Sequence, residues 1–183
     1  MIEIPENSVI YVARHATPDR SRPDLPYHTP PGPDLTEKGR AQAAELGAFL
    51  RQAGARHILS SPLERSWQTA KIAAEACGAT AELNLDLAEM RLDELPKNVS
   101  ERMERAFALA CRLSAADGPV ALVSHGAPVL ALVNALGLDR DSVEKMRVYD
   151  SRNLIPMGGA WEVRPGVVRL VFAPEGVEIK KLW

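Results

Sequence analysis

Residues 9–17 read VIYVARHAT, an apolar run rich in β-branched residues that stops abruptly at an arginine and a histidine. Residues 9–13 are typical of a short strand buried on both faces of a sheet, because no polar residue interrupts them. Polar side chains begin where the apolar run ends. The stretch therefore predicts a buried strand with Arg14 and His15 at its carboxyl end.

The same arrangement occurs twice more along the chain. Residues 57–60 form a second short strand that precedes a helix with Arg65 in its first turn, and residues 120–123 form a third strand directly before Ser124 and His125. The carboxyl ends of parallel strands meet at one edge of an open sheet, where ligands bind. We therefore expect the polar side chains that follow the three strands to lie close together.

Helical patterns separate these strands. Thr36 predicts an N-cap, Ser61 followed by Pro62 predicts a second N-cap with proline at the first helical position, and Gly78 and Gly137 predict helix ends. Apolar residues at helical spacing predict helices over residues 37–52, 63–77, 99–115 and 127–136.

The remaining segments complete the expected topology. Residues 18–33 are rich in proline and predict a long surface loop, residues 80–84 fit a further strand, and residues 85–97 show no clear period. Two β-rich pieces within residues 160–173 predict a hairpin at a sheet edge. Together the elements predict an α/β fold: a three-layer sandwich with a mostly parallel central sheet, helices on both faces and an antiparallel edge.

The composition narrows the classes of partner. The chain has 183 residues, of which 46% are hydrophobic and 25% charged, which suits one folded domain, and its formal net charge is −2. We expect no nucleic-acid partner, because there is no overall positive field, and no membrane partner, because no run approaches the roughly 18 apolar residues of a membrane span. Cys77 and Cys111 show no CxxC spacing, and the N-terminus does not resemble a secretory signal, so we expect reduced thiols and a cytoplasmic protein.

The chemistry expected at the strand ends follows from the residue types. Two imidazoles and two guanidiniums beside two helix N-termini would make a local positive pocket in a protein of negative net charge. One guanidinium group can bind two phosphate oxygens at once and stays charged at physiological pH, whereas an imidazole can act as a nucleophile near neutral pH. This combination favours phosphoryl chemistry.

Four segments together resemble the histidine phosphatase superfamily, also called phosphoglycerate mutase-like. They are VIYVARHAT at 9–17, LTEKGRAQAAELGAFL at 35–50, ILSSPLERSWQTAKIAA at 58–74 and VALVSHGAPVLAL at 120–132. The resemblance implies one such domain over residues 1–183, with His15 as the nucleophile that forms a phosphohistidine and with Arg14, Arg65 and His125 binding the phosphate. It also implies that no metal and no other cofactor takes part.

The resemblance further implies a proton donor within an L-x-E segment, and Leu87-Ala88-Glu89 matches this pattern. Glu89 is therefore our candidate general acid. The residues after it depart from the pattern of the sugar-phosphate enzymes, and RHA at Ala16 replaces the usual RHG, so Asp86, Asp93 and Glu94 are kept as alternative acids.

The expected function is hydrolysis of a phosphomonoester on a small metabolite by the phosphatase branch of this family. A mutase is disfavoured because the chain is short and the segment around Glu89 lacks the mutase-like pattern. The alternatives are a phosphohistidine-protein phosphatase and a noncatalytic member that only binds a phosphorylated ligand. The apolar C-terminal hairpin is a candidate contact for a homodimer.

Some residues are assigned from charge or position alone. Residues 18–33 and 86–102 are expected to line the pocket. Their cations could bind a second anionic group on the substrate: Arg20, Arg22, Arg91 and Lys97. Ser21 stands where many relatives place a phosphate ligand, whereas His28, His57 and Met90 are expected to have structural roles only.

Overall fold

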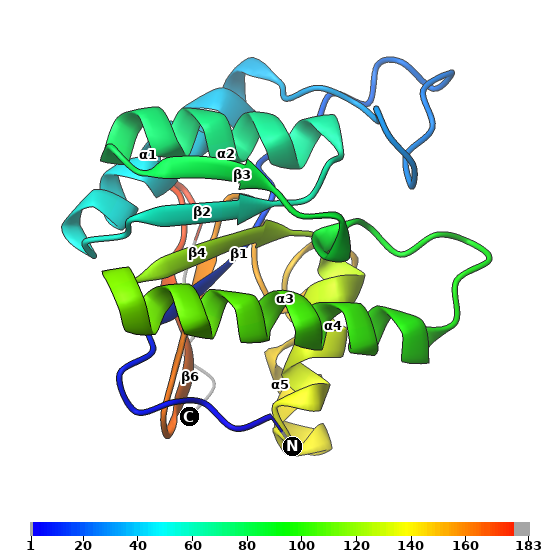
Figure 1. Cartoon of the computed structure of the whole chain (residues 1–183). Helices are drawn as coiled ribbons and strands as arrows, with labels where there is room; N and C mark the ends of the chain where they lie inside the picture. The colour runs from blue at the N-terminus through cyan, green and yellow to red at the C-terminus, as the bar shows by residue number, and fades with distance from the viewer. Residues whose placement is uncertain (1, 178–183) are drawn as a thin grey trace.

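The structure, a computed structural model, describes residues 2–177, and a six-stranded sheet forms its centre (Figure 1). The strands are β1 (Ile10–Arg14), β2 (His57–Ser60), β3 (Thr80–Leu83), β4 (Val120–Ser124), β5 (Ala160–Arg164) and β6 (Val167–Phe172). Their order across the sheet is β3-β2-β4-β1-β5-β6. The first four strands are mutually parallel, whereas β5 pairs antiparallel with β1 and with β6.

Helices cover both faces of the sheet. The helices are α1 (Glu37–Gln52), α2 (Glu64–Cys77), α3 (Pro96–Asp117), α4 (Gly126–Ala135) and α5 (Arg140–Met146). Figure 1 shows α1 and α2 on one side of the strands and α3 and α4 on the other, with α5 beyond α4. The predicted fold class is therefore confirmed, including the antiparallel edge.

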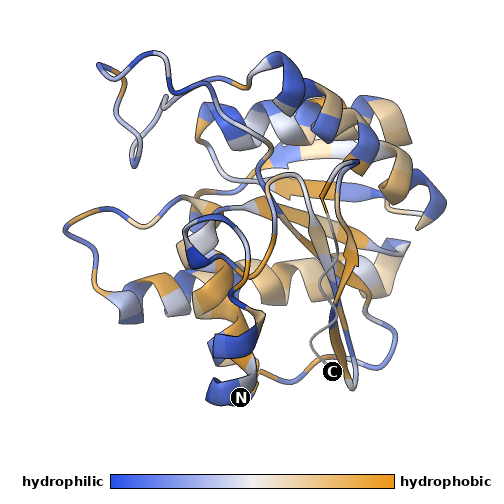
Figure 2. Ribbon diagram, turned by 180° about the vertical axis from the view of Figure 1, so that it is seen from behind, coloured by the Kyte–Doolittle hydropathy of each residue, from blue (hydrophilic) through white to orange (hydrophobic). Residues whose placement is uncertain are grey.

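The alternation of side chains along β1 explains why the four residues before Arg14 are apolar. Tyr11 and Ala13 pack in the cluster formed with α1 and α2, whereas Ile10 and Val12 pack in the cluster formed with α3 and α4. Successive side chains of a strand point to opposite faces, so a strand covered on both faces has only apolar positions. In Figure 2 the central strands of the sheet are coloured mostly as hydrophobic.

Several predicted helix bounds shift in the structure. Helix α2 begins at Glu64 with Leu63 as an N-cap that makes no side-chain bond, so the predicted N-cap role of Ser61 is wrong. Helix α3 extends beyond the predicted residues 99–115 at both ends: it starts at Pro96, a residue suited to a first turn, and ends at Asp117 before Gly118. Helix α4 begins and ends one residue earlier than predicted.

Helix α5 is an element that the sequence analysis did not predict. It has only seven residues, too few for a reliable apolar period, but Asp139 caps it by accepting a hydrogen bond from the backbone N–H of Ser142 at 2.9 Å.

Among the described helices, none combines the length and the apolar character that crossing a membrane requires. The strand β6 forms one edge of the sheet, and its use as a dimer contact stays a prediction.

Candidate active site

The register of the parallel strands brings three loops to the same place. Arg14 at the end of β1 lies opposite Ser124 at the end of β4, and Ser60 at the end of β2 lies opposite Val123. The ladder continues one residue further, because the N–H of His15 donates to the carbonyl oxygen of Ser124 at 3.0 Å. The residues that follow each strand are therefore side by side, as the sequence predicts.

His15 directly follows β1 at the carboxyl edge of the sheet, where it is buried and only 1% exposed. Its Nδ1 lies 2.8 Å from the carbonyl oxygen of Ala16, and since a carbonyl oxygen only accepts, Nδ1 carries the proton. The lone pair of Nε2 is then available. Burial lowers the pKa of His15 well below its ordinary value, and the charges of Arg65 and Arg14 lower that pKa further, so the ring stays neutral.

His125 lies beside His15, with 5.1 Å between the ring centroids. Its Nε2 is 2.7 Å from the hydroxyl of Ser61 and 3.2 Å from that of Ser66. A hydroxyl that donates to Nε2 leaves the ring proton on Nδ1, the nitrogen that has no hydrogen-bond partner, and burial lowers the pKa of His125 well below its ordinary value. Ser61 thus orients the second histidine instead of capping a helix.

Arg14 is held by a carboxylate that lies far along the chain. Its Nη1 and Nη2 each donate to one oxygen of Asp150 at 2.8 Å, and Nη1 also lies 3.2 Å from the carbonyl oxygen of Ile155. Two parallel bonds of this kind fix the plane of a guanidinium. The sequence analysis missed Asp150, because nothing in its local sequence separates it from a surface carboxylate.

Arg65 is fully buried, at 0% exposure. Its Nη1 donates to the carbonyl oxygen of Tyr27 at 2.9 Å, and its Cζ lies 4.2 Å from the centroid of the Tyr27 ring. The proline-rich loop therefore folds back and holds a guanidinium from α2. Tyr27 is a second residue that sequence reasoning missed, and the aromatic side chain within a polar loop is the only signal that could have identified it.

The polar atoms left without partners define what the site can bind. Among residues 2–177, five buried side-chain polar atoms make no hydrogen bond: Arg14 Nε, Arg65 Nε, Arg65 Nη2, His125 Nδ1 and Trp161 Nε1. Four of the five belong to the three predicted phosphate-binding residues. Buried donors of this kind are costly unless an acceptor meets them. An anion with several oxygens, such as a phosphate group, supplies such acceptors.

Glu89 is the carboxyl group that faces these donors. Its Oε2 lies 3.7 Å from Nη2 of Arg65 and 3.7 Å from Nδ1 of His125, while Oε1 accepts from the N–H of Met90 at 2.9 Å. Burial raises the pKa of Glu89 above its ordinary value, although the bond from Met90 and the charge of Arg65 act in the opposite direction. A carboxyl group in this environment holds a proton to higher pH.

The three alternative acids have other partners. Asp86 pairs with Arg105, Glu94 pairs with Arg102, and the side chain of Asp93 is 83% exposed beside Arg91. The structure therefore selects Glu89 among the four carboxylates as the one that faces Arg65 and His125.

A pocket of about 370 Å³ opens above His15 and Glu89. The loops before α1 and before α3 both contribute to its wall, with further residues from the start of α4 and from residues 151–153. The wall is made by Arg14, His15, Arg20, Tyr27, His28, Glu89, Met90, Arg91, Leu92, Gly126, Ala127, Ser151 and Asn153.

This pocket corrects several assignments made from sequence. Of the four candidate cations, Arg20 and Arg91 line it, whereas Arg22 pairs with Asp24 and Lys97 with Glu101. Ser21 is outside the wall, and its backbone N–H donates to Asp19. His28 and Met90, expected to be structural only, both line the pocket.

Gly126 shows why the third strand is followed by glycine. A Cβ at this position would clash with Oδ1 of Asn153, which also lines the pocket. Any larger residue would displace the side chain of Asn153 or move the start of α4. Within residues 2–177, no group of three or more His, Cys, Asp or Glu side chains is placed to hold a metal ion.

The chain is similar in sequence to known proteins. The sequence model of the histidine phosphatase superfamily (branch 1) matches residues 10–97. A protein of Klebsiella pneumoniae (strain 342) named "Probable phosphoglycerate mutase GpmB" is 32% identical over 148 residues, which cover 62% of this chain and 68% of that protein.

Two solved structures share the fold. Bacillus stearothermophilus YhfR superposes with a TM-score of 0.69 at 19% identity, covering 96% of this chain and 100% of that one. The mycobacterial glucosyl-3-phosphoglycerate phosphatase Rv2419c, in complex with VO3, superposes with a TM-score of 0.61 at 19% identity, covering 90% and 97%.

Proposed function

The chain belongs to the histidine phosphatase superfamily, and we propose that it is a metal-independent phosphatase that hydrolyses a phosphomonoester through a phosphohistidine on His15. The observation that carries the proposal is the set of unpartnered donors on Arg14, Arg65 and His125. The His125 ring lies 5.1 Å from that of His15, the charges of Arg65 and Arg14 act on His15, and the Nε2 lone pair of this neutral histidine is available. A nucleophile surrounded by donors for phosphate oxygens is suited to phosphoryl transfer.

The first step forms a bond between Nε2 of His15 and phosphorus while the bond from phosphorus to the leaving oxygen breaks. Glu89 gives its proton to that oxygen, because an alkoxide leaves poorly without one. Arg14, Arg65 and His125 stabilise the charge on the three remaining phosphate oxygens. Asp150 orients Arg14, and Ser61 orients His125, through the hydrogen bonds described above.

In the second step, water attacks the phosphorus of the phosphohistidine and the bond to Nε2 breaks. The Glu89 carboxylate takes a proton from that water and so returns to its starting state. Inorganic phosphate and free His15 result. Leu92, on the pocket wall, is 91% exposed, so the pocket opens to solvent at this residue, which is the route for the attacking water in this proposal.

A mutase is the second candidate, because the Klebsiella relative carries that name. In a mutase the phosphoryl group returns to another hydroxyl of the same molecule instead of passing to water. The open pocket wall favours transfer of the phosphoryl group to water, since transfer to a substrate hydroxyl requires that the phosphohistidine be shielded from water.

Labelling of the enzyme distinguishes the candidate functions. We expect ³²P from a panel of phosphomonoesters, in the presence of a metal chelator, to appear transiently on His15 as an acid-labile, base-stable label and then as inorganic phosphate. Label that returns to an isomer of the substrate would identify a mutase. Tight binding of a phosphate ester without any label on the protein would identify a noncatalytic binding protein. If His15 takes up label only from phosphohistidine peptides, the protein is a phosphohistidine-protein phosphatase.

Arg20 provides a test of substrate charge. Its Nη2 donates to the hydroxyl of Tyr27 at 3.0 Å, and its Cζ lies 4.8 Å from the centroid of the Tyr27 ring, which holds the cation at the pocket wall. We expect Arg20→Gln to raise KM about tenfold for a phosphomonoester that carries a carboxylate, since a charged hydrogen bond contributes about 1.5–3 kcal/mol. KM for an aryl phosphate that carries no second anionic group should change little.

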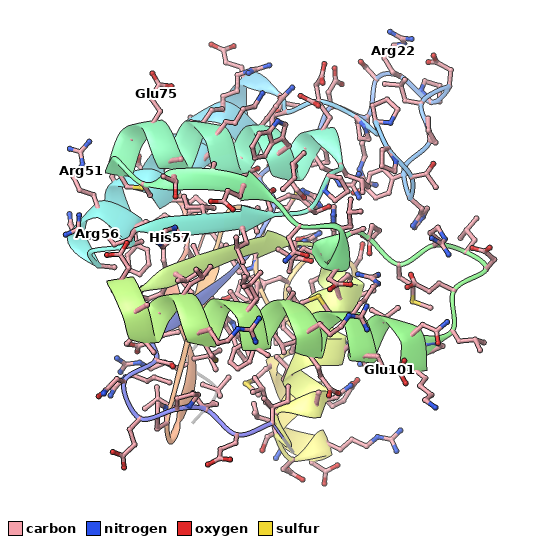
Figure 3. All side chains as sticks on the ribbon, viewed as in Figure 1. Arg22, Arg51, Arg56, His57, Glu75 and Glu101 are labelled. Carbon is pink, nitrogen blue, oxygen red and sulfur yellow. The ribbon has the colours of Figure 1, made fainter. Side chains whose placement is uncertain are left out.

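Arg22 is the matched control for this prediction. It lies two residues further along the same loop, pairs with Asp24, and points away from the molecule at the outer end of the loop (Figure 3). Steady-state kinetics with the two substrates should show no change in Arg22→Gln. Equal losses for both substrates in Arg20→Gln would contradict a role in binding a second anion.

A further inference from the structure

Glu89 lies on an exposed connection, so its position depends on contacts from elsewhere in the molecule. Residues 88–95 join the short 3-10 turn Leu85–Leu87 to α3, and Leu92 in their middle is 91% exposed. A general acid must meet the leaving oxygen within hydrogen-bond distance, and a misplacement of about 1 Å can cost on the order of 10² in rate.

Arg102, in the second turn of α3, binds this connection on both sides of Glu89. Its Nη1 donates to the carbonyl oxygen of Asp86 at 2.7 Å and to that of Ala88 at 2.6 Å. Its Nε and Nη2 donate to the two carboxylate oxygens of Glu94 at 2.8 Å and 3.1 Å. One guanidinium thus connects the residue before Glu89 to a residue five positions after it.

These bonds are well protected from solvent. Arg102 is 8% exposed, and the side chain of Glu94 is 9% exposed. A buried guanidinium with a bidentate carboxylate partner is held far more firmly than a surface ion pair. The connection is therefore anchored to helix α3 at Ala88 and Glu94, and the turn before it is anchored at Asp86.

Other anchors of the connection each hold a single carbonyl oxygen. The hydroxyl of Ser124 donates to Leu87 at 2.8 Å, and Nδ1 of His28 donates to Met90 at 3.1 Å. Neither joins the two sides of Glu89. Arg102 lines a neighbouring pocket of about 270 Å³ together with Glu89 and Glu94, and it is not part of the wall of the pocket above His15.

We propose that Arg102 is a positioning residue for the general acid: it clamps the backbone before Glu89 to the carboxylate of Glu94 and so holds the Glu89 carboxyl against the leaving oxygen. This inference rests on the proposed function with Glu89 as the acid. Arg102 does not touch the substrate, and its effect passes through the backbone of residues 86–94.

The leaving group of the substrate isolates this role. An aryl ester such as 4-nitrophenyl phosphate leaves without much protonation, whereas an alkyl ester such as glycerol phosphate needs the acid. We expect Arg102→Ala to lower kcat/KM for the alkyl ester by up to about 10²-fold and for the aryl ester by less than about threefold. Arg102→Lys, which keeps the charge but not the fork, should recover part of the alkyl activity and provides a readout if the alanine variant fails to fold.

Arg105 supplies a matched control on the same helix. It lies one turn further along α3 and binds the carboxylate of Asp86 at 2.7 Å, but its side chain is 62% exposed and it reaches only one side of Glu89. We expect Arg105→Ala to leave the ratio of aryl to alkyl activity unchanged. A change in this ratio equal to that of the Arg102 variants would contradict the clamp.

The same measurements in a Glu89→Gln background separate the clamp from the acid. If Arg102 acts only through Glu89, its replacement produces no further selectivity for the leaving group once the acid is gone. Additional selectivity caused by replacing Arg102 in that background, or equal losses for both esters when Arg102 is replaced with Glu89 intact, would overturn the clamp alone. Absence of selectivity in Glu89→Gln itself would overturn the acid assignment and the clamp with it.

Discussion

Replacing His15 with alanine is expected to lower kcat for 4-nitrophenyl phosphate by about 10⁴-fold or more, because the step that forms the phosphoenzyme loses its nucleophile. His15 is buried, and its Nδ1 is occupied by the carbonyl oxygen of Ala16, so Nε2 alone is available for attack. The same variant should take up no phosphoryl label. Steady-state kinetics and labelling with ³²P measure the two effects independently.

His57 is the matched control for His15→Ala. It begins β2 at the end of the sheet opposite to the loop that carries Arg22 (Figure 3), and it contacts Thr80 and Asp117. We expect His57→Ala to keep full activity. Turnover by His15→Ala close to that of the wild type, with a native melting temperature, would refute the assignment of the nucleophile.

Replacing Glu89 with glutamine is expected to lower kcat/KM for alkyl phosphates by about 10²- to 10⁴-fold and to affect an activated aryl phosphate far less. Glutamine keeps the size of the side chain and can still accept a hydrogen bond from Met90, but it has no proton to give to an alkoxide. Asp93→Asn is the comparison, because the side chain of Asp93 is 83% exposed beside Arg91 instead of facing His125. Equal losses for both classes of ester in Glu89→Gln would argue against proton donation.

The pH dependence of Glu89→Gln checks the same role. Glu89 must be protonated to act, and because its pKa is raised, activity with alkyl phosphates should persist above the ordinary range of a glutamate and fall as pH rises through that raised pKa. His15 must be unprotonated, and its lowered pKa keeps the nucleophile available toward acid pH. The alkaline fall should disappear in Glu89→Gln, since an amide does not titrate. A fall that persists unchanged would assign it to another group.

The fold and the residues at the strand ends could be predicted because they depend on local patterns. The unbroken apolar run before Arg14 reflects a strand that is covered on both faces, and this requirement appears directly in the sequence. Polar residues directly after such strands meet at one edge by the geometry of a parallel sheet. His15 and His125 were located by this rule, and their rings are 5.1 Å apart.

The α/β architecture, the resemblance to the family, and the histidines and arginines at the carboxyl edge of the sheet could be identified from the amino-acid sequence. The three-dimensional packing was needed to identify the carboxylate that faces them, the bond between Ser61 and His125, and the contacts by which Tyr27 and Asp150 hold the two guanidiniums. Periodicity and capping act over a few residues and are written in the local sequence, whereas the partner of Arg14 lies 136 residues away and is chosen by packing alone.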